Sequence, residues 1–185
     1  QYIVDSILKP VGVEVSGPVN PTPDMIEELA LPYRLEGNKA VPEKRVRFDV
    51  YPAGDAYLSV PAMSTVLLAH LNGGTHKGVS LLSETSVAEM HKPQFGGTYG
   101  LGVGIRELNG EKLIMHAGGV PGYSTHFVLG IDSKVGVYVA SNAGGAHLPM
   151  RYLAQLSIDL LMGKEIGTGL VREIVGIGTA LAADE

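Results

Sequence analysis

The sequence predicts an α+β fold in which an antiparallel β-sheet meander is flanked by α-helices. Four strand-like runs follow one another at about 99–107, 112–117, 123–131 and 135–141, with short turns between them. Consecutive strands joined by turns of this length pair antiparallel. Apolar residues at helical spacing precede the sheet at about 60–71 and follow it at about 148–162. We therefore expect one amphipathic helix before the sheet in the chain and one after it, and both can pack on the sheet.

The composition indicates a globular domain and argues against several other classes of protein. The chain has 185 residues, 45% of them apolar and 18% charged, which is typical of one globular domain. The net charge is −5 and the basic residues are scattered, so the clustered basic surface of a nucleic-acid-binding protein is not indicated. No apolar run approaches the ~20 residues of a membrane-spanning helix. The absence of cysteine excludes disulfides and thiol catalysis.

The first half of the chain contains several local signals. Apolar residues predict a short helix over 2–9 that ends at Pro10, and the proline-rich segment 11–24 predicts a loop. Asp24 is predicted to cap a helix that continues to about Leu31. The segment 33–50 has a Gly37-Asn38 turn signal and a basic patch, which we interpret as a solvated face: Lys44, Arg45 and Arg47.

Two further helices have clear start and stop signals. Ser59 is the predicted N-cap of the 60–71 helix, Pro61 suits its first turn, and Asn72-Gly73-Gly74 closes it. Ser83 opens another helix, which ends before Pro93. The tail, 164–185, shows no firm period and has no predicted structure.

One stretch, 113–129, carries the features of a candidate site. An apolar run leads to His116, and four turn-favouring residues separate it from a second apolar and aromatic run: Gly118, Gly119, Pro121 and Gly122. Glycines beside a polar side chain let a ligand approach the backbone and leave N–H groups free to donate. A plain hairpin turn has the same composition, so both interpretations remain open on this stretch alone.

A series of short motifs resembles the serine β-lactamase and penicillin-binding protein family, in its class C-like, esterase and D-Ala carboxypeptidase branch. His116-Ala117-Gly118 resembles that family's His-x-Gly element. Four other segments resemble family motifs and occur in the same order as in the family. They are a helix end, a turn before a helix, a strand and a strand that ends in Asn: 7–13, 51–59, 99–104 and 137–142. The resemblance covers about residues 3–163, and we expect residues 1–163 to be the C-terminal portion of the domain and 164–185 a separate tail.

The resemblance implies a fold and a chemistry. The fold would be the C-terminal part of the β-lactamase/transpeptidase-like fold. The chemistry would be acyl-enzyme hydrolysis of a β-lactam, a D-Ala peptide or an ester, without a cofactor. Gly119 would donate a backbone N–H to the oxyanion, and His116 would face the proton-relay Tyr or a substrate carboxylate. Ala117, Gly118 and Tyr123 would contact substrate. A periplasmic or extracellular location rests on the resemblance alone.

The family's Ser-x-x-Lys and Tyr-x-Asn motifs precede the segment at which this chain begins. The match Ser6-Ile7-Leu8-Lys9 is the kind that this composition produces by chance, and Lys9 precedes Pro10, which disfavours helical geometry. We therefore expect this chain alone to be inactive and to need the missing N-terminal part of the same domain as its partner. The alternative is a non-catalytic β-lactamase-like domain that binds a peptide or partner at a strand edge.

The histidines and asparagine outside the family motifs have simpler interpretations. His116 and His126 lie on hairpin partners and could approach each other, but no third ligand has a defined spacing, so we predict no metal site. His70 shares an apolar helix face and is interpreted as a core or boundary residue. His76, His91 and His147 are interpreted as surface residues, and Asn142 as a strand-end cap.

Overall fold

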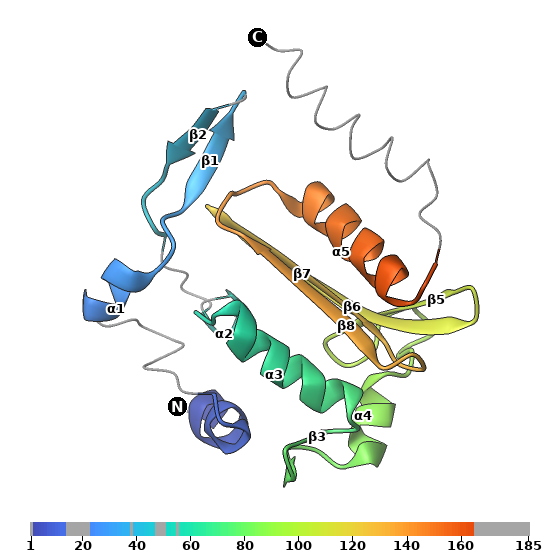
Figure 1. Cartoon of the computed structure of the whole chain (residues 1–185). Coiled ribbons are helices and arrows are strands. Elements are labelled where there is room, and N and C mark those ends of the chain that lie inside the picture. The colour runs from blue at the N-terminus through green and yellow to red at the C-terminus, as the bar shows by residue number, and fades with distance from the viewer. Residues whose placement is uncertain (1, 14–22, 38, 47–50, 55, 165–185) are drawn as a thin grey trace.

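The computed structural model describes residues 2–13, 23–37, 39–46, 51–54 and 56–164. Its centre is a four-stranded antiparallel meander in the order β5-β6-β7-β8 (Figure 1). The strands are β5 (Gly104–Leu108), β6 (Glu111–Val120), β7 (Tyr123–Gly130) and β8 (Val135–Ser141). The predicted α+β fold class and its antiparallel meander are confirmed. The predictions for Arg47 and for the tail from residue 165 lie outside the described residues.

Two helices cover opposite faces of the sheet (Figure 1). α3 (Val60–Leu71) packs on one face, where Ile114 and Leu129 meet Leu67 and Leu71. α5 (His147–Leu161) packs on the other, where Leu113 and Val128 meet Ala154 and Ile158. Successive strand residues point to opposite faces, so even-numbered residues of β6 face α3 and odd-numbered residues face α5. This alternation decides where each candidate side chain lies.

The helix-start signals at Ser59 and Ser83 are confirmed. The Ser59 hydroxyl accepts from the Ala62 N–H at 3.3 Å, and the Ser83 hydroxyl accepts from Ser86 N–H at 3.1 Å at the start of α4 (Glu84–Met90). α3 ends before Gly73 and Gly74, which have φ of +66° and +93°. Serine caps stabilise such helix starts because they satisfy an N–H group that has no partner within the helix.

The N-terminal region differs from the prediction. Val4–Leu8 is a π-helix (η1) and Lys9–Val11 a 3₁₀ turn (η2), so Pro10 does not stop the helix. Proline fits at the start of a new helical segment, where its missing N–H needs no partner. Gly12, with φ of +78°, is the residue that ends it.

The next elements are shorter than predicted or were not predicted. α1 (Pro23–Glu28) ends before Leu31 and includes Asp24, which was expected to cap it. A hairpin of β1 (Tyr33–Glu36) and β2 (Lys39–Pro42) occupies the segment that was predicted only to contain a turn. A one-turn helix and a second small hairpin complete the list: α2 (Tyr51–Gly54), β3 (Thr75–His76) and β4 (Val79–Ser80).

Two of the histidines predicted to be at the surface are buried. The exposed fractions are 8% for His76 and 4% for His91. The His91 ring stacks on His70 with centroids 5.6 Å apart, and His70 Nδ1 lies 3.4 Å from His91 Nε2. These side chains come from α3 and from the end of α4, so the pairing depends on how the helices pack. In the described residues, no helix has the length and apolar character needed to cross a membrane.

Candidate functional site

The candidate site is the end of β6, where this strand extends beyond its neighbour. β5 pairs with β6 only up to Gly104 opposite Met115. β7 pairs with β6 along the next five residues, up to Val120 opposite Tyr123. Among the described residues, 116–120 therefore have a strand on one side only. A strand edge of this kind presents backbone N–H and C=O groups to a ligand.

The strand is longer than predicted, and this changes the role of the glycines. Gly118 and Gly119 were assigned to the loop, but they lie within β6, and only Pro121 and Gly122 form the turn. Neither glycine has the positive φ that Gly122 has, at +79°. A Cβ on Gly118 would lie 2.6 Å from Thr125 Oγ1, and one on Gly119 would overlap the His147 ring. Close packing, rather than turn geometry, therefore requires both glycines.

His116 and Ala117 lie on opposite faces of β6, and both are exposed. His116 is on the α3 face opposite Phe127, with ring centroids 6.3 Å apart and an angle of 25° between the planes. His126 lies opposite Ala117 on the α5 face, so the two histidines are on opposite faces of the sheet. The part of the chain that the structure describes contains no group of three or more side chains that could hold a metal ion.

His147 is a neighbour of the site that sequence reasoning missed. It is the first residue of α5, and its imidazole covers Gly119 from the α5 face of the sheet. The start of α5 is fixed on β7 because the buried Ser124 hydroxyl accepts from the Ala146 N–H at 3.2 Å and donates to the Ala143 carbonyl at 3.1 Å. No local sequence pattern indicated the contact, since Gly119 and His147 meet only in the folded sheet.

Tyr123 lies directly opposite Val120, at the start of β7, and its hydroxyl is already bonded. It donates to the Ala30 carbonyl at 2.6 Å and accepts from Arg45 Nε at 3.3 Å. The half-buried ring thus joins the hairpin to the segment that follows α1. The predicted substrate contact by Tyr123 remains a prediction, and its ring is the part of the side chain available for it.

The interpretation of the basic patch as a solvated face is wrong for Arg45, whereas Lys44 is exposed. The Arg45 guanidinium donates to the Ile26 and Leu29 carbonyls, both at 2.7 Å, and to Ala30 at 3.3 Å, besides reaching the Tyr123 hydroxyl. Carbonyls at a helix end lack partners within the helix, and a forked cation satisfies several at once. Arg45 therefore fixes α1 and the chain after β2 against the tip of the β6–β7 hairpin.

Backbone contacts hold the same segment on the hairpin tip. The Tyr33 N–H donates to the Asn142 carbonyl at 2.8 Å, and the Asn142 side chain donates to the Leu31 carbonyl at 2.9 Å. A Cβ on Gly122 would overlap Pro32. Asn142, predicted to cap a strand end, thus connects the end of β8 to the chain before β1. These contacts place the β1–β2 hairpin beside the candidate site.

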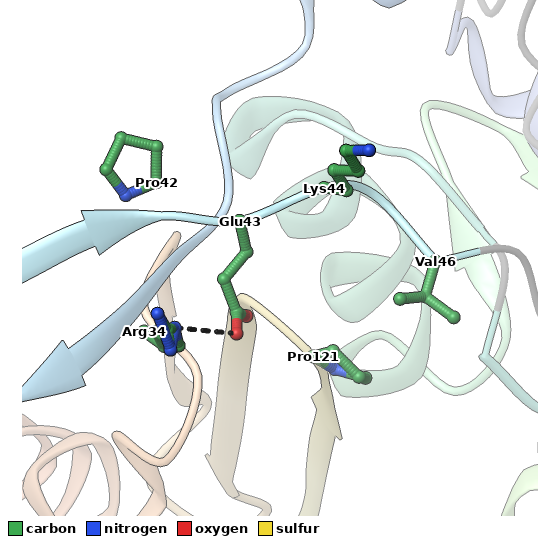
Figure 2. Close-up of a pocket in the computed structure, with 6 residues that line it drawn as sticks. All are labelled: Arg34, Pro42, Glu43, Lys44, Val46 and Pro121. Carbon is green, nitrogen blue, oxygen red and sulfur yellow. Dashed lines mark ion pairs between the residues drawn. The ribbon is translucent and has the colours of Figure 1, made fainter.

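A pocket of about 370 Å³ lies between these elements (Figure 2). Its lining comes from the chain around β1 and β2 and from the turn after β6: Arg34, Pro42, Glu43, Lys44, Val46 and Pro121. The Glu43 side chain extends toward Arg34 and the hairpin tip, while Lys44 extends to the other side of the backbone (Figure 2). The pocket therefore adjoins the end of the strand that carries His116 and Gly119.

Three histidines near the sheet are electrostatically disfavoured as cations. Burial lowers the pKa of His126, and the charge of Arg151 and the proximity of His116 add to the effect. Burial also lowers the pKa of His70. The pKa of His91 falls to about 4, because of burial first, then His70, Lys112 and Lys134. All three imidazoles are neutral at neutral pH, so they contribute packing and hydrogen bonding rather than charge.

Solved structures share the fold. An octameric penicillin-binding protein homologue from Pyrococcus abyssi superposes with a TM-score of 0.65 at 23% identity, over 89% of this chain and 37% of its own. A penicillin-binding protein from Bacillus halodurans gives 0.58 at 21% identity, over 86% and 48%. SurE gives 0.65 at 18% identity, over 89% and 40%. This chain therefore spans less than half the length of each.

Sequence comparisons give the family. No curated protein matches the chain. The family model described as Beta-lactamase matches residues 1–161, which includes the whole sheet, both flanking helices and the strand edge at 116–120. The chain therefore belongs to the beta-lactamase family.

Proposed function

We propose that this chain supplies the substrate-binding strand and half of the oxyanion hole of a serine hydrolase. The reaction is acyl transfer: a serine oxygen bonds to the substrate carbonyl carbon, the bond from that carbon to the leaving nitrogen or oxygen breaks, and the serine proton passes to this leaving atom. Water then hydrolyses the acyl-enzyme. The substrate is a β-lactam, a D-Ala peptide or an ester, as in the class C-like, esterase and carboxypeptidase branch. Family membership supports hydrolysis in general, and the strand edge supports the assignment of roles.

The observation that carries the proposal is the open edge at 116–120, with His116-Ala117-Gly118-Gly119 along it. In a ladder closed by a two-residue turn, the pair flanking the turn is hydrogen-bonded and the next pair is not. Applied to β6, this rule directs the Gly119 N–H away from β7, toward the open edge. That is the orientation an oxyanion donor needs.

His116 suits a role in proton transfer. Its imidazole is exposed on the α3 face and is held against Phe127 by ring stacking. A neutral imidazole can both donate and accept a hydrogen bond. We assign it to face the proton-relay tyrosine or the substrate carboxylate, with Ala117, Gly118 and the Tyr123 ring lining the path along the strand.

The nucleophile is proposed to come from a segment N-terminal to Gln1 that carries the Ser-x-x-Lys and Tyr-x-Asn motifs. The one Ser-x-x-Lys match within the chain is a poor candidate, because the Lys9 ammonium pairs with Asp5 at 2.9 Å on the exposed surface of η1. Such a segment would have surface to cover: Tyr2 is 76% exposed, and no described strand pairs with the outer edge of β8.

The second candidate function is a non-catalytic module that binds a peptide along the same strand edge. The open edge favours it as much as it favours the hydrolase, since both need backbone groups without a strand partner. The two candidates differ in whether a nucleophile meets the bound carbonyl.

A hydrolysis assay distinguishes the serine hydrolase from the binding module. We expect no hydrolysis of nitrocefin or p-nitrophenyl esters above background by the 185-residue chain, and turnover of at least one of them by a protein that joins it to the upstream motifs. In that protein, His116→Ala is expected to lower kcat roughly 10²-fold, as loss of a general acid–base group does. Initial rates measured by absorbance check each outcome.

The matched control is Lys77→Ala, an exposed substitution on the β3–β4 turn, which is expected to leave the rate unchanged. Circular dichroism establishes that each variant is folded. Full activity in folded His116→Ala protein would remove this residue from the mechanism. A joined protein that binds substrate without turnover would favour the binding module instead.

A further inference from the structure

The pocket beside Pro121 extends the candidate site in a defined direction. Val120 is the last residue of β6, and Pro121 lines the pocket. Pro121 comes two positions after Gly119, which is roughly 7 Å at ~3.4 Å per residue. A ligand that lies along the open edge with its carbonyl at Gly119 therefore places a group two residues away in this pocket.

The walls of the pocket are held in place. Arg45 and Tyr123 join the chain after β2 to the end of α1 through four hydrogen bonds onto carbonyls, of 2.6 to 3.3 Å. The Glu43 N–H itself donates to the Pro32 carbonyl at 2.8 Å. The pocket therefore exists before a ligand arrives, and little conformational entropy is lost on binding.

The side chains of residues 43–46 are alternately partly buried and exposed. Glu43 and Arg45 are partly buried toward the hairpin, whereas Lys44 and Val46 are exposed. Arg45 is satisfied by carbonyls, and Lys44 extends away from Glu43 (Figure 2). Arg34 also lines the pocket beside Glu43, but its guanidinium pairs with Glu36 as well, so the Glu43 carboxylate is the anionic group that the pocket offers a ligand.

That carboxylate is incompletely paired. Its side chain is only 25% exposed, and its ion pair with Arg34 Nε is 3.6 Å long. Arg34 has a closer partner in Glu36, at 2.6 Å. Among the described residues, no hydrogen bond to the Glu43 carboxylate is found within the pocket. A partly buried carboxylate with one distant partner favours an ammonium, which brings charge and donors together.

We propose that Glu43 makes this pocket a recognition site for a substrate ammonium group. This assignment rests on the proposed function of the 116–120 edge. A ligand strand antiparallel to β6 places its N-terminal side toward Pro121. The substrate class is therefore a short peptide whose free amino terminus lies about two residues before the carbonyl held at Gly119. Pro42, Val46 and Pro121 contribute apolar surface around this amine.

Binding to the chain itself tests this without any need for turnover. The probes are triglycine amide, with a free amine, and N-acetyl-triglycine amide, both achiral and titrated by NMR at pH 6.5, where the amine is protonated. The free amine is expected to bind about three- to five-fold more tightly, the range of an exposed ion pair. Glu43→Gln is expected to abolish this preference, and higher salt to reduce it.

Glu107→Gln is the matched control, since it makes the same change on an exposed residue of β5 at the far end of the sheet. It is expected to keep the preference. Equal affinity of the two probes for the unchanged chain, or a preference that survives Glu43→Gln, would overturn the ammonium site while leaving the strand-edge function intact. No shifts at 116–120 with either probe would count against the strand-edge function itself.

Discussion

Gly119 lies in extended β6 backbone, and the His147 ring occupies the space into which a Cβ would point. The glycine is therefore required by a neighbour from another element rather than by its own φ. This contact lies on the sheet face opposite His116, so it supports the strand end without occupying the side where His116 is exposed.

Gly119→Ala tests this packing in the isolated chain. The added Cβ overlaps the imidazole in its present position, so the ring must shift, and we expect the free energy of unfolding to fall by about 1–3 kcal/mol, as overpacking does. His147→Ala in the same molecule removes the overlap and is expected to recover most of that loss. Urea unfolding of the single and double variants measures both effects.

Gly97→Ala is the control for a general loss on replacing glycine. Gly97 has no positive φ, and a Cβ there meets nothing closer than 3.6 Å. We expect its effect to stay within about 0.5 kcal/mol. A double variant as unstable as Gly119→Ala alone would mean that the ring is not what excludes the side chain.

Among the elements, the β6–β7 hairpin is joined to the end of α1 through one tyrosine and one arginine. The Tyr123 hydroxyl and the Arg45 guanidinium both bond to the Ala30 carbonyl, and each contacts the other. These residues are 93, 15 and 78 positions apart in sequence. The junction therefore holds the pocket wall and the strand end as one unit.

Tyr123→Phe removes the hydroxyl and leaves the ring. We expect a loss of about 0.5–1.5 kcal/mol in unfolding free energy, the range for one hydrogen bond with a partly covered acceptor. Amide hydrogen exchange of 30–45 is expected to quicken more than that of β7 and β8, because this junction holds the segment. The two measurements together distinguish a local effect from a general one.

Tyr2→Phe makes the same chemical change at a side chain that is 76% exposed, and we expect no measurable effect from it. If Tyr123→Phe left exchange at 30–45 unaltered, the hydroxyl would not be what holds the segment on the hairpin.

For the whole molecule, buried histidines connect stability to pH. The pKa of His91 is about 4 in the folded chain, against an ordinary value near 6.5. Below pH 6.5 the unfolded chain gains a proton that the folded chain does not, so stability is complete above this pH and is lost as the pH falls toward 4. The lowered pKa values of His70 and His126 act in the same direction.

We therefore expect the free energy of unfolding to decrease by roughly 2 kcal/mol on account of His91 between pH 6.5 and pH 4. His91→Gln should flatten this part of the profile, even if the variant is less stable throughout. Urea denaturation at a series of pH values gives the slope, and Lys77→Gln is the control because lysine does not titrate in this range. An unchanged slope in His91→Gln would contradict the assignment.

The elements whose signals are local could be predicted from the sequence. Ser59 and Ser83 begin helices because a hydroxyl satisfies a nearby N–H. Consecutive strand-like runs with short turns predicted the four-stranded meander, and apolar residues at helical spacing predicted the two flanking helices. The order of short motifs identified the family and the strand bearing His116.

Contacts between residues far apart in the chain could be seen only in the folded molecule. The extension of β6 beyond β5 follows from strand register, which leaves 116–120 open. The burial of His91 against His70, the cover of Gly119 by His147 and the bonding of Arg45 at the end of α1 all join separate elements. No local pattern encodes such contacts, because their energy comes from burying and satisfying polar groups where elements meet. The pocket at Glu43 exists for the same reason.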